Sequence, residues 1–267
     1  MKKQENSSTN AKPTEKSDIT HFFNEMSVGR NETIQSNPIV DYEQHVRSKK
    51  VLDLLSANRG EKILDIGCGN ARDIVQIVGT GAQVIGVDIS EGMVLEAQQE
   101  LAKFGLGNVL LKVGDATRLE FADDEFDKIL CSEVIEHIPE AEKALREMWR
   151  VLKPGGLLVL STPNPRSWYG FERYIVWQGI LRKKWNHPFD KWRSMADLLS
   201  MVESGGFRPT IRSGACYVPG FLMTYFLLPR FIQRSLLWFV RKIEPTAAKR
   251  LPQYGYMVCL AALKPDA

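Results

Sequence analysis

The stretch "ILDIGCGNARDIV", residues 63–75, decides the fold class of this chain. Its first residues are apolar, as in a strand buried on both faces, and the "GCG" that follows is typical of a tight turn. The residues from 71 to 78, "ARDIVQIV", have the apolar spacing of a helix. Such strand–turn–helix units bring the backbone close to nucleotide-like ligands. The stretch therefore predicts a ligand site at the turn.

The same alternation of strands and helices continues on both sides of this unit. It predicts parallel strands with crossover helices, and ligands at the carboxyl ends of the strands. A helix from Ser194, a plausible N-cap, precedes two further strands that would close the sheet. The expected strands are 62–67, 83–89, 108–115, 126–132, 156–163, 207–218 and 254–265, and the expected helices are 71–78, 91–105, 141–152 and 194–207.

The bulk composition predicts one cytoplasmic domain. The net charge of +3 is too small to indicate a nucleic-acid partner, and the four cysteines are too far apart for a metal or disulfide framework. No run of about 20 apolar residues is present to span a bilayer. We expect a polar, disordered tail at 1–18 and one domain at 19–267, which divides into N-terminal helices at 19–57, a core at 58–163, and cap insertions at 164–193 and 219–250.

Three ligands can be compared for the glycine turn. A dinucleotide site requires a third glycine at the position where this chain has Arg72, so the sequence disfavours a dinucleotide. The sequence also contains no phosphate-loop motif. S-adenosyl-L-methionine (SAM) has no phosphates, and instead needs close backbone approach and acidic acceptors. Asp65 precedes the glycines, while Asp88 and Asp115 end the next two strands, where a carboxylate can accept ribose hydroxyls or an adenine amino group. An isolated aspartate at a strand end is more often a turn residue or a helix cap than a ligand-binding residue.

Five ordered segments, "LDIGCG", "VDIS", "GDA", "DKILCSEVIEHI" and "LKPGGLLVLSTPN", resemble the class I SAM-dependent methyltransferases over about residues 42–165. The resemblance implies an α/β, Rossmann-like three-layer sandwich with a seven-stranded, mostly parallel sheet, an antiparallel last strand and helical cap insertions. It also implies a set of cofactor-binding residues: Asp65, Gly67 and Gly69 at the methionine side of SAM, Asp88 at the ribose with Ile89 beside it, Asp115 and Ala116 at the adenine, and the backbone at Cys131 facing the sulfonium.

The segment "SEVIEHIPE" carries the candidate chemistry. On a helical turn Glu133, Glu136 and His137 would share a face, where they can hold a divalent metal, or where His137 or Glu133 can act as a base. This arrangement resembles ubiquinone-biosynthesis O-methyltransferases and small-RNA 2′-O-methyltransferases, in which it supports a metal, but also relatives without one. His187 is a further candidate base or ligand, unless it is an ordinary loop histidine. The alternative is that Glu136 and His137 only fix the turn.

Residues 220–245 form the most apolar segment of the chain, and their pattern predicts a basic amphipathic helix. Ile232, Leu236, Phe239, Val240 and Ile243 follow helical spacing, with arginines and a lysine elsewhere on the helix. The segment predicts either a cap over the acceptor pocket or membrane-surface contact through 220–243.

The sequence thus predicts a SAM-dependent methyltransferase that acts on a small or lipid-like acceptor at oxygen, cytoplasmic or peripheral at the inner membrane face. Transfer to nitrogen or carbon, and an inactive SAM-binding or membrane-docking protein, are the alternatives.

Overall fold

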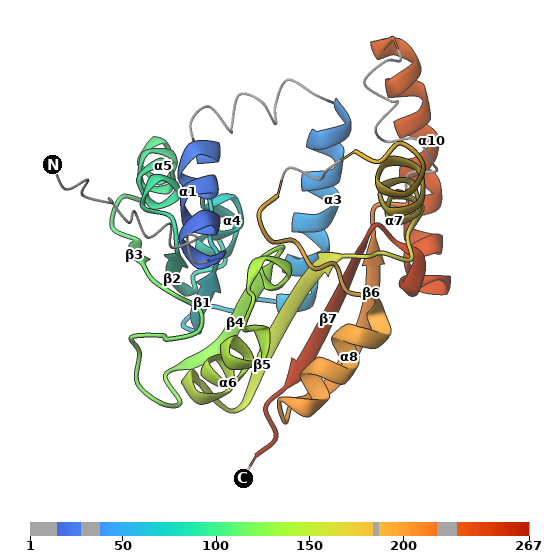
Figure 1. Cartoon of the computed structure of the whole chain (residues 1–267). Coiled ribbons are helices and arrows are strands. Elements are labelled where there is room, and N and C mark those ends of the chain that lie inside the picture. The colour runs from blue at the N-terminus through green and yellow to red at the C-terminus, as the bar shows by residue number, and fades with distance from the viewer. Residues whose placement is uncertain (1–14, 28–37, 184–186, 218–228, 267) are drawn as a thin grey trace, which may run out of the picture.

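A single twisted sheet runs through the middle of the protein, and helices cover both of its faces (Figure 1). The computed structural model describes residues 15–27, 38–183, 187–217 and 229–266. The sheet has seven strands in the order β3-β2-β1-β4-β5-β7-β6, and β7 runs antiparallel to both of its neighbours. This architecture confirms the fold class predicted from the sequence. The strands are β1 (Lys62–Ile66), β2 (Gln83–Asp88), β3 (Leu110–Val113), β4 (Phe126–Ser132), β5 (Leu152–Pro163), β6 (Arg208–Ala215) and β7 (Met257–Leu263).

The strand register brings the predicted site residues to one edge of the sheet. Ile66 at the end of β1 pairs with Val87 of β2 on one side and with Cys131 of β4 on the other. Because these strands are parallel, the segments that follow them leave the sheet at the same level. The glycine turn, Asp88 and the start of "SEVIEHI" therefore meet at the carboxyl edge.

Two hydrophobic clusters fix the helices on the sheet. On one face Leu145, Met148 and Leu198 are fully buried, and on the other Val51 and Ile74 are equally buried. The helices that supply these contacts and their neighbours are α1 (Glu15–Ser27), α3 (Pro38–Leu55), α4 (Arg72–Val78), α5 (Glu91–Lys103), α6 (Ala141–Val151), α7 (Trp168–Phe171), α8 (Met195–Ser204) and α10 (Arg230–Arg250), with short or irregular turns at η1 (Ile135–His137), η2 (Glu172–Ile180) and η3 (Pro252–Tyr254).

The N-terminus of α8 has the cap that the sequence predicts. Ser194 caps α8 in a capping box, in which the Ser194 hydroxyl accepts from the Asp197 amide at 3.3 Å and the Asp197 carboxylate accepts from the Ser194 amide at 3.0 Å. The predicted N-cap is thus confirmed. The sequence assigned residues 15–18 to the polar tail. In the structure these residues form the first turn of α1, which begins at Glu15. Residues 1–14 of that predicted tail lie outside the described residues.

The cap insertions contain α7 with η2, and α10. Parts of both insertions, 184–186 with Trp185 and 218–228, lie outside the described residues. Within the described part of the chain, no helix combines the length and apolarity needed to cross a bilayer.

Candidate functional site

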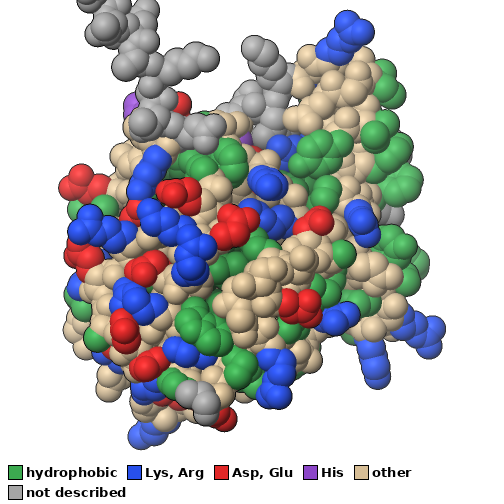
Figure 2. All heavy atoms as spheres, turned by 60° about the horizontal axis from the view of Figure 1, so that its bottom comes forward, with side chains coloured by type: hydrophobic (Ala, Val, Ile, Leu, Met, Phe, Trp, Pro, Cys, Tyr) green, Lys and Arg blue, Asp and Glu red, His purple; other side chains and the backbone are tan. Residues whose placement is uncertain are grey.

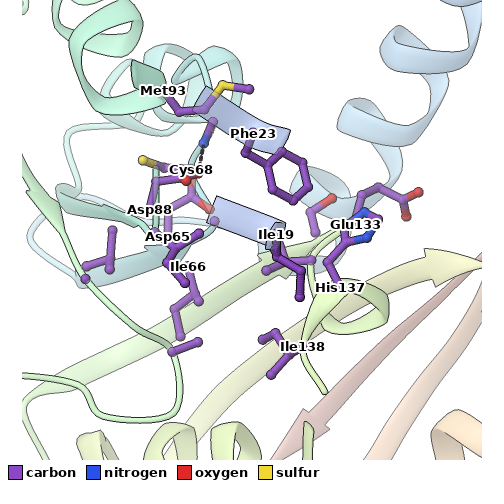
Figure 3. A pocket seen from close by; sticks show the side chains of 18 of the residues that line it. Ile19, Phe23, Asp65, Ile66, Cys68, Asp88, Met93, Glu133, His137 and Ile138 are labelled. Carbon is purple, nitrogen blue, oxygen red and sulfur yellow. Dashed lines mark hydrogen bonds between the residues drawn. The ribbon is translucent and has the colours of Figure 1, made fainter. Parts of the chain in front are cut away.

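A cavity of about 360 Å³ lies at the carboxyl edge of the sheet, lined by the glycine turn and the ends of β2 and β4. Figure 3 shows Asp65 and Asp88 on one side of it and Glu133 and His137 on the other. The predicted cofactor residues that line it are Asp65, Gly67, Gly69, Asp88, Ile89, Asp115 and Ala116.

Cys131 is the one predicted cofactor residue outside this wall. Its side chain is completely buried in the core, because it alternates inward on β4. The wall begins at Ser132 instead, one residue later. The sequence assigned only the backbone at Cys131 to the sulfonium side, and that assignment stays a prediction.

The glycines of the turn serve two different purposes. Gly67 has a φ of +69°, and a Cβ there would lie 2.1 Å from Cγ2 of Val134. Gly69 has a φ of +50°, and a Cβ there would meet no atom within 4 Å. Gly67 is therefore required by the packing of the turn against the segment after β4. Gly69 instead leaves its side of the cavity open to a ligand.

Asp88 joins the turn to the start of α5. One carboxylate oxygen accepts from the Gly69 amide and the other from the Ser90 amide, both at 2.9 Å. A carboxylate oxygen has two lone pairs and can accept more than one hydrogen bond. The local structural role and the predicted ribose role are both compatible with this geometry.

Asp115 has several hydrogen-bond donors around its carboxylate. It accepts from the amide and hydroxyl of Thr117 at 2.9 and 2.8 Å, and it forms an ion pair with Lys16 of α1. Burial raises the pKa of Asp115, but the hydrogen bonds from Lys16 and Thr117 outweigh that effect and bring the pKa below its usual range. Asp115 is thus held ionised at the cavity wall.

The helix α1 covers the cavity, which the sequence did not indicate. Ile19 and Phe23 line it from α1 (Figure 3). Asn24 fixes this helix on α5, because its side-chain oxygen accepts from the Ser90 hydroxyl at 2.6 Å and from the Gly92 amide at 3.1 Å. No local sequence signal marks these contacts, which join residues far apart in the chain.

Arg47 of α3 is a further site residue that the sequence did not indicate. It is buried and lines the cavity, with its guanidinium 2.6 Å from the Ser132 hydroxyl and 3.4 Å from the Asp73 carboxylate. Its Nε is buried and has no hydrogen-bond partner among the described residues. In the sequence Arg47 stands in "HVRSKK", a run that is typical of a solvent-exposed helix face, so it carried no signal.

Glu133 and His137 face the cavity from the segment after β4. The Ser161 hydroxyl donates to Glu133 at 2.9 Å. Burial raises the pKa of Glu133 to about 7, although Arg47 and Ser161 oppose the shift. His137 Nδ1 lies 3.2 Å from the Phe189 carbonyl, so in a neutral ring with the proton on Nδ1, Nε2 is the acceptor nitrogen.

His187 packs against His137 and against Phe23 of α1. The two imidazole rings stack with their centroids 4.5 Å apart, but His187 is not part of the cavity wall. Its predicted role as a base therefore has no direct geometric support.

The predicted helical turn at 133–137 is wrong in one respect. Glu133 has a φ of +59° and lies before the 3-10 turn η1, so it does not share a face with Glu136 and His137. The Glu136 carboxylate is buried and 3.8 Å from His137 Nε2, while Glu133 turns toward Ser161. In the described part of the chain no three acidic, histidine or cysteine side chains are grouped as metal ligands. This donor set does not fit a divalent metal, and we derive no step through one.

Comparison with known proteins decides the family. The family model described as "Methyltransferase domain" matches residues 57–204, which is more than half of the chain. The chain belongs to this methyltransferase family. Methyltransferase GfsG of Streptomyces halstedii is 32% identical over 196 residues, which cover 70% of this chain and 67% of that protein.

Demethylmenaquinone methyltransferase of Geobacillus kaustophilus is similar to a shorter part of this methyltransferase-family chain. The two are 35% identical over 100 residues, which cover 38% of this chain and 43% of the relative. The chain thus spans less than half the length of that relative.

Solved structures agree with the methyltransferase fold. The [4+2]-cyclase SpnF superposes with a TM-score of 0.68 at 18% identity, covering 96% of this chain and 98% of that one. The magnesium protoporphyrin IX methyltransferase of Synechocystis PCC 6803, solved with bound SAH, gives a TM-score of 0.65 at 19% identity, covering 94% and 100%. At these identities the likeness concerns the fold alone.

Proposed function

We propose that this protein is a SAM-dependent methyltransferase acting on a small, apolar or lipid-like acceptor, with oxygen as the acceptor atom. One observation carries the proposal. A single cavity joins the acidic wall formed by Asp88 and Asp115 to the pair Glu133 and His137. Cofactor binding and acceptor chemistry can therefore take place in one space.

The wall of the cavity has groups that match each part of SAM. Asp88 can accept from the ribose hydroxyls, and the ionised Asp115 can accept from the adenine amino group. Arg47 offers a buried Nε–H that has no acceptor in the described structure, which suits the carboxylate of the methionine portion. Gly69 keeps the backbone approach open.

When bound, SAM supplies a methyl group that is already activated for transfer. The residues of this chain then have to align the acceptor and take up its proton. Glu133, with a pKa of about 7, can accept the proton of a hydroxyl as the oxygen–methyl bond forms. Ser161 orients the carboxylate, because it donates to one of its oxygens. His137 can share this task through Nε2 or position the acceptor.

Binding of SAM is tested by calorimetry on the wild type and on Asp88→Asn. We expect a saturable SAM complex that the substitution weakens. Asp53→Asn is the matched control, because Asp53 is an exposed aspartate of α3 that pairs with Lys49 outside the cavity. Binding of NADH without binding of SAM would overturn the proposal.

Transfer is then tested with deuterated-methyl SAM on a panel of catechols, quinols and hydroxylated lipids, with product analysis by mass spectrometry and NMR. Methyl on oxygen supports the proposal as stated. Methyl on carbon or nitrogen would refute the choice of acceptor atom. SAM binding without turnover of any acceptor class would favour an inactive SAM-binding protein.

A further inference from the structure

The outward side of α10 exposes large aromatic side chains. Phe231 is 71% exposed, Trp238 62% and Phe239 55%. Large aromatic side chains that gather on one helix, and are not scattered singly over the surface, mark a site of interaction. Of the apolar residues that follow helical spacing in the sequence, Val240 is buried in the domain, whereas Phe239 is exposed.

The inward side of α10 already has its partners. Leu237 and Val240 are buried in one cluster with Tyr42 of α3 and Cys216. The helix therefore does not need its outward aromatics to dock on the domain. The cap interpretation accounts for one side of α10 and leaves the other side unexplained.

The outward aromatics lie among positive charges. Arg234, Arg241 and Lys242 are all exposed, and Lys242 Nζ lies 3.7 Å from the centre of the Trp238 ring. The only acidic residue of α10 is Glu244. It is buried, and it accepts from the Cys216 amide at 2.6 Å. Arg241 instead has its guanidinium 5.5 Å from the centre of the Tyr42 ring, toward α3. We call the aromatic and basic residues Phe231, Arg234, Trp238, Phe239 and Lys242 the outer face of α10.

A second set of exposed apolar side chains lies on the neighbouring α7 and η2. Trp168, Phe171 and Ile175 of α7 and η2 are 53%, 49% and 49% exposed. Tyr169, between them in the sequence, packs on the cluster that contains Leu237, and α7 lies beside α10 (Figure 1). Figure 2 shows hydrophobic side chains interleaved with Lys and Arg along the right-hand edge, where Figure 1 places α10.

We propose that the outer face of α10 docks this protein on a membrane surface that contains anionic lipids. The charge of the face is complementary to such headgroups, since its ionised groups are all basic. Trp238 and the phenylalanines enter the boundary between headgroups and acyl chains, while the long arginine and lysine side chains reach the phosphates. A lipid surface suits this face, because its exposed aromatic rings lie among basic side chains and the one acidic residue of α10 is buried.

Docking would bring the cap insertions to the lipid. This goes beyond the proposed function, and it offers a lipid-like acceptor a route that avoids bulk water. The docking itself does not depend on SAM or on turnover.

The test is co-sedimentation of the full chain with vesicles of phosphatidylcholine, with and without phosphatidylglycerol. We expect binding to the anionic vesicles that falls as salt is added, because exposed charges are screened. Arg234→Glu with Lys242→Glu should lower the partition coefficient by roughly 10-fold or more, given the usual contribution of each basic residue near a charged surface. Trp238→Ser with Phe239→Ser should lower binding at all salt concentrations.

Matched controls change the same chemistry elsewhere. Leu95→Ser with Phe104→Ser removes apolar side chains that are 52% and 58% exposed at α5, and Arg146→Glu with Arg208→Glu reverses two exposed charges away from α10. Both controls should bind vesicles as the wild type does. SAM affinity, measured in parallel, should be unchanged in every variant and reports correct folding.

Vesicle binding that is absent, that is equal for both lipid mixtures, or that the controls weaken as much as the α10 variants would overturn the proposal. Vesicle binding without SAM binding would instead refute the proposed function and leave docking in place.

Discussion

Gly67→Ala tests whether the glycine turn is packed as the structure shows. An alanine at a φ of +69° costs about 1–2 kcal/mol of backbone strain. Its Cβ would also lie 2.1 Å from Cγ2 of Val134, and such overpacking costs about 1–3 kcal/mol. We therefore expect the free energy of unfolding to fall by about 2–5 kcal/mol. Urea unfolding followed by circular dichroism measures the change.

Alanine substitutions at two other glycines separate the cost of backbone strain from the cost of the clash with Val134. Gly105 has a φ of +71° and Gly69 a φ of +50°, and a Cβ at either position would meet nothing within 4 Å. Both Ala variants should lose only the backbone part, about 1–2 kcal/mol. Gly69→Ala should also weaken SAM binding, because its methyl group enters the cavity, whereas Gly105→Ala should not.

A double-mutant cycle isolates the clash. Val134→Ala removes both Cγ atoms and leaves only the Val134 Cβ, at 3.0 Å from the position of the added methyl group. The cycle between Gly67→Ala and Val134→Ala should give a favourable coupling of about 1–3 kcal/mol. If Gly67→Ala destabilises no more than Gly105→Ala, or if the coupling is zero, the packing of the turn is not as argued.

Three further results are expected. Turnover should rise with pH through about 7 as Glu133 loses its proton, and Glu133→Gln should abolish that rise in the pH profile of kcat. Arg47→Met should raise the Kd for SAM by roughly 10- to 100-fold in calorimetry, the usual effect of losing a hydrogen bond to a charged group; an unchanged Kd would remove Arg47 from the carboxylate site. Lys16→Met should raise the pKa of Asp115 in an NMR titration, because Lys16 lowers it. The depressed pKa stabilises the fold above the unfolded pKa, so the variant's stability deficit should be under about 1 kcal/mol at neutral pH and vanish as pH falls through the folded pKa.

The sequence predicted the part of the site that depends on short-range patterns of residues. The strands, the glycine turn and the aspartates after β2 and β3 follow from apolar runs, breakers and the rule that parallel strands end at one edge. Lys16 and Arg47 could not be predicted in this way. They meet Asp115 and Ser132 across 99 and 85 residues of sequence, and only the packing of α1 and α3 brings them there.

The error at Glu133 has a similar cause. The spacing of "EVIEH" favours a helical face, but Glu133 adopts a left-handed conformation that no local signal marks. In that conformation its carboxylate reaches Ser161 of β5, whereas Glu136 is buried. The same three residues therefore form a candidate base and its surroundings in place of a metal site. Sequence spacing identified the residues correctly and their arrangement incorrectly.

Asp88 shows why a structural role and a ligand role need not exclude one another. Its two oxygens hold the Gly69 and Ser90 amides, which fixes the turn against the N-terminus of α5 before any ligand arrives. The same bonds orient the carboxylate, so that its position is set by the protein and not by the ligand. A ribose bound there would meet acceptors that are already in place, and less side-chain entropy would be lost on binding. The turn that the sequence offered as an alternative to cofactor binding is then the means by which Asp88 is positioned to bind the cofactor.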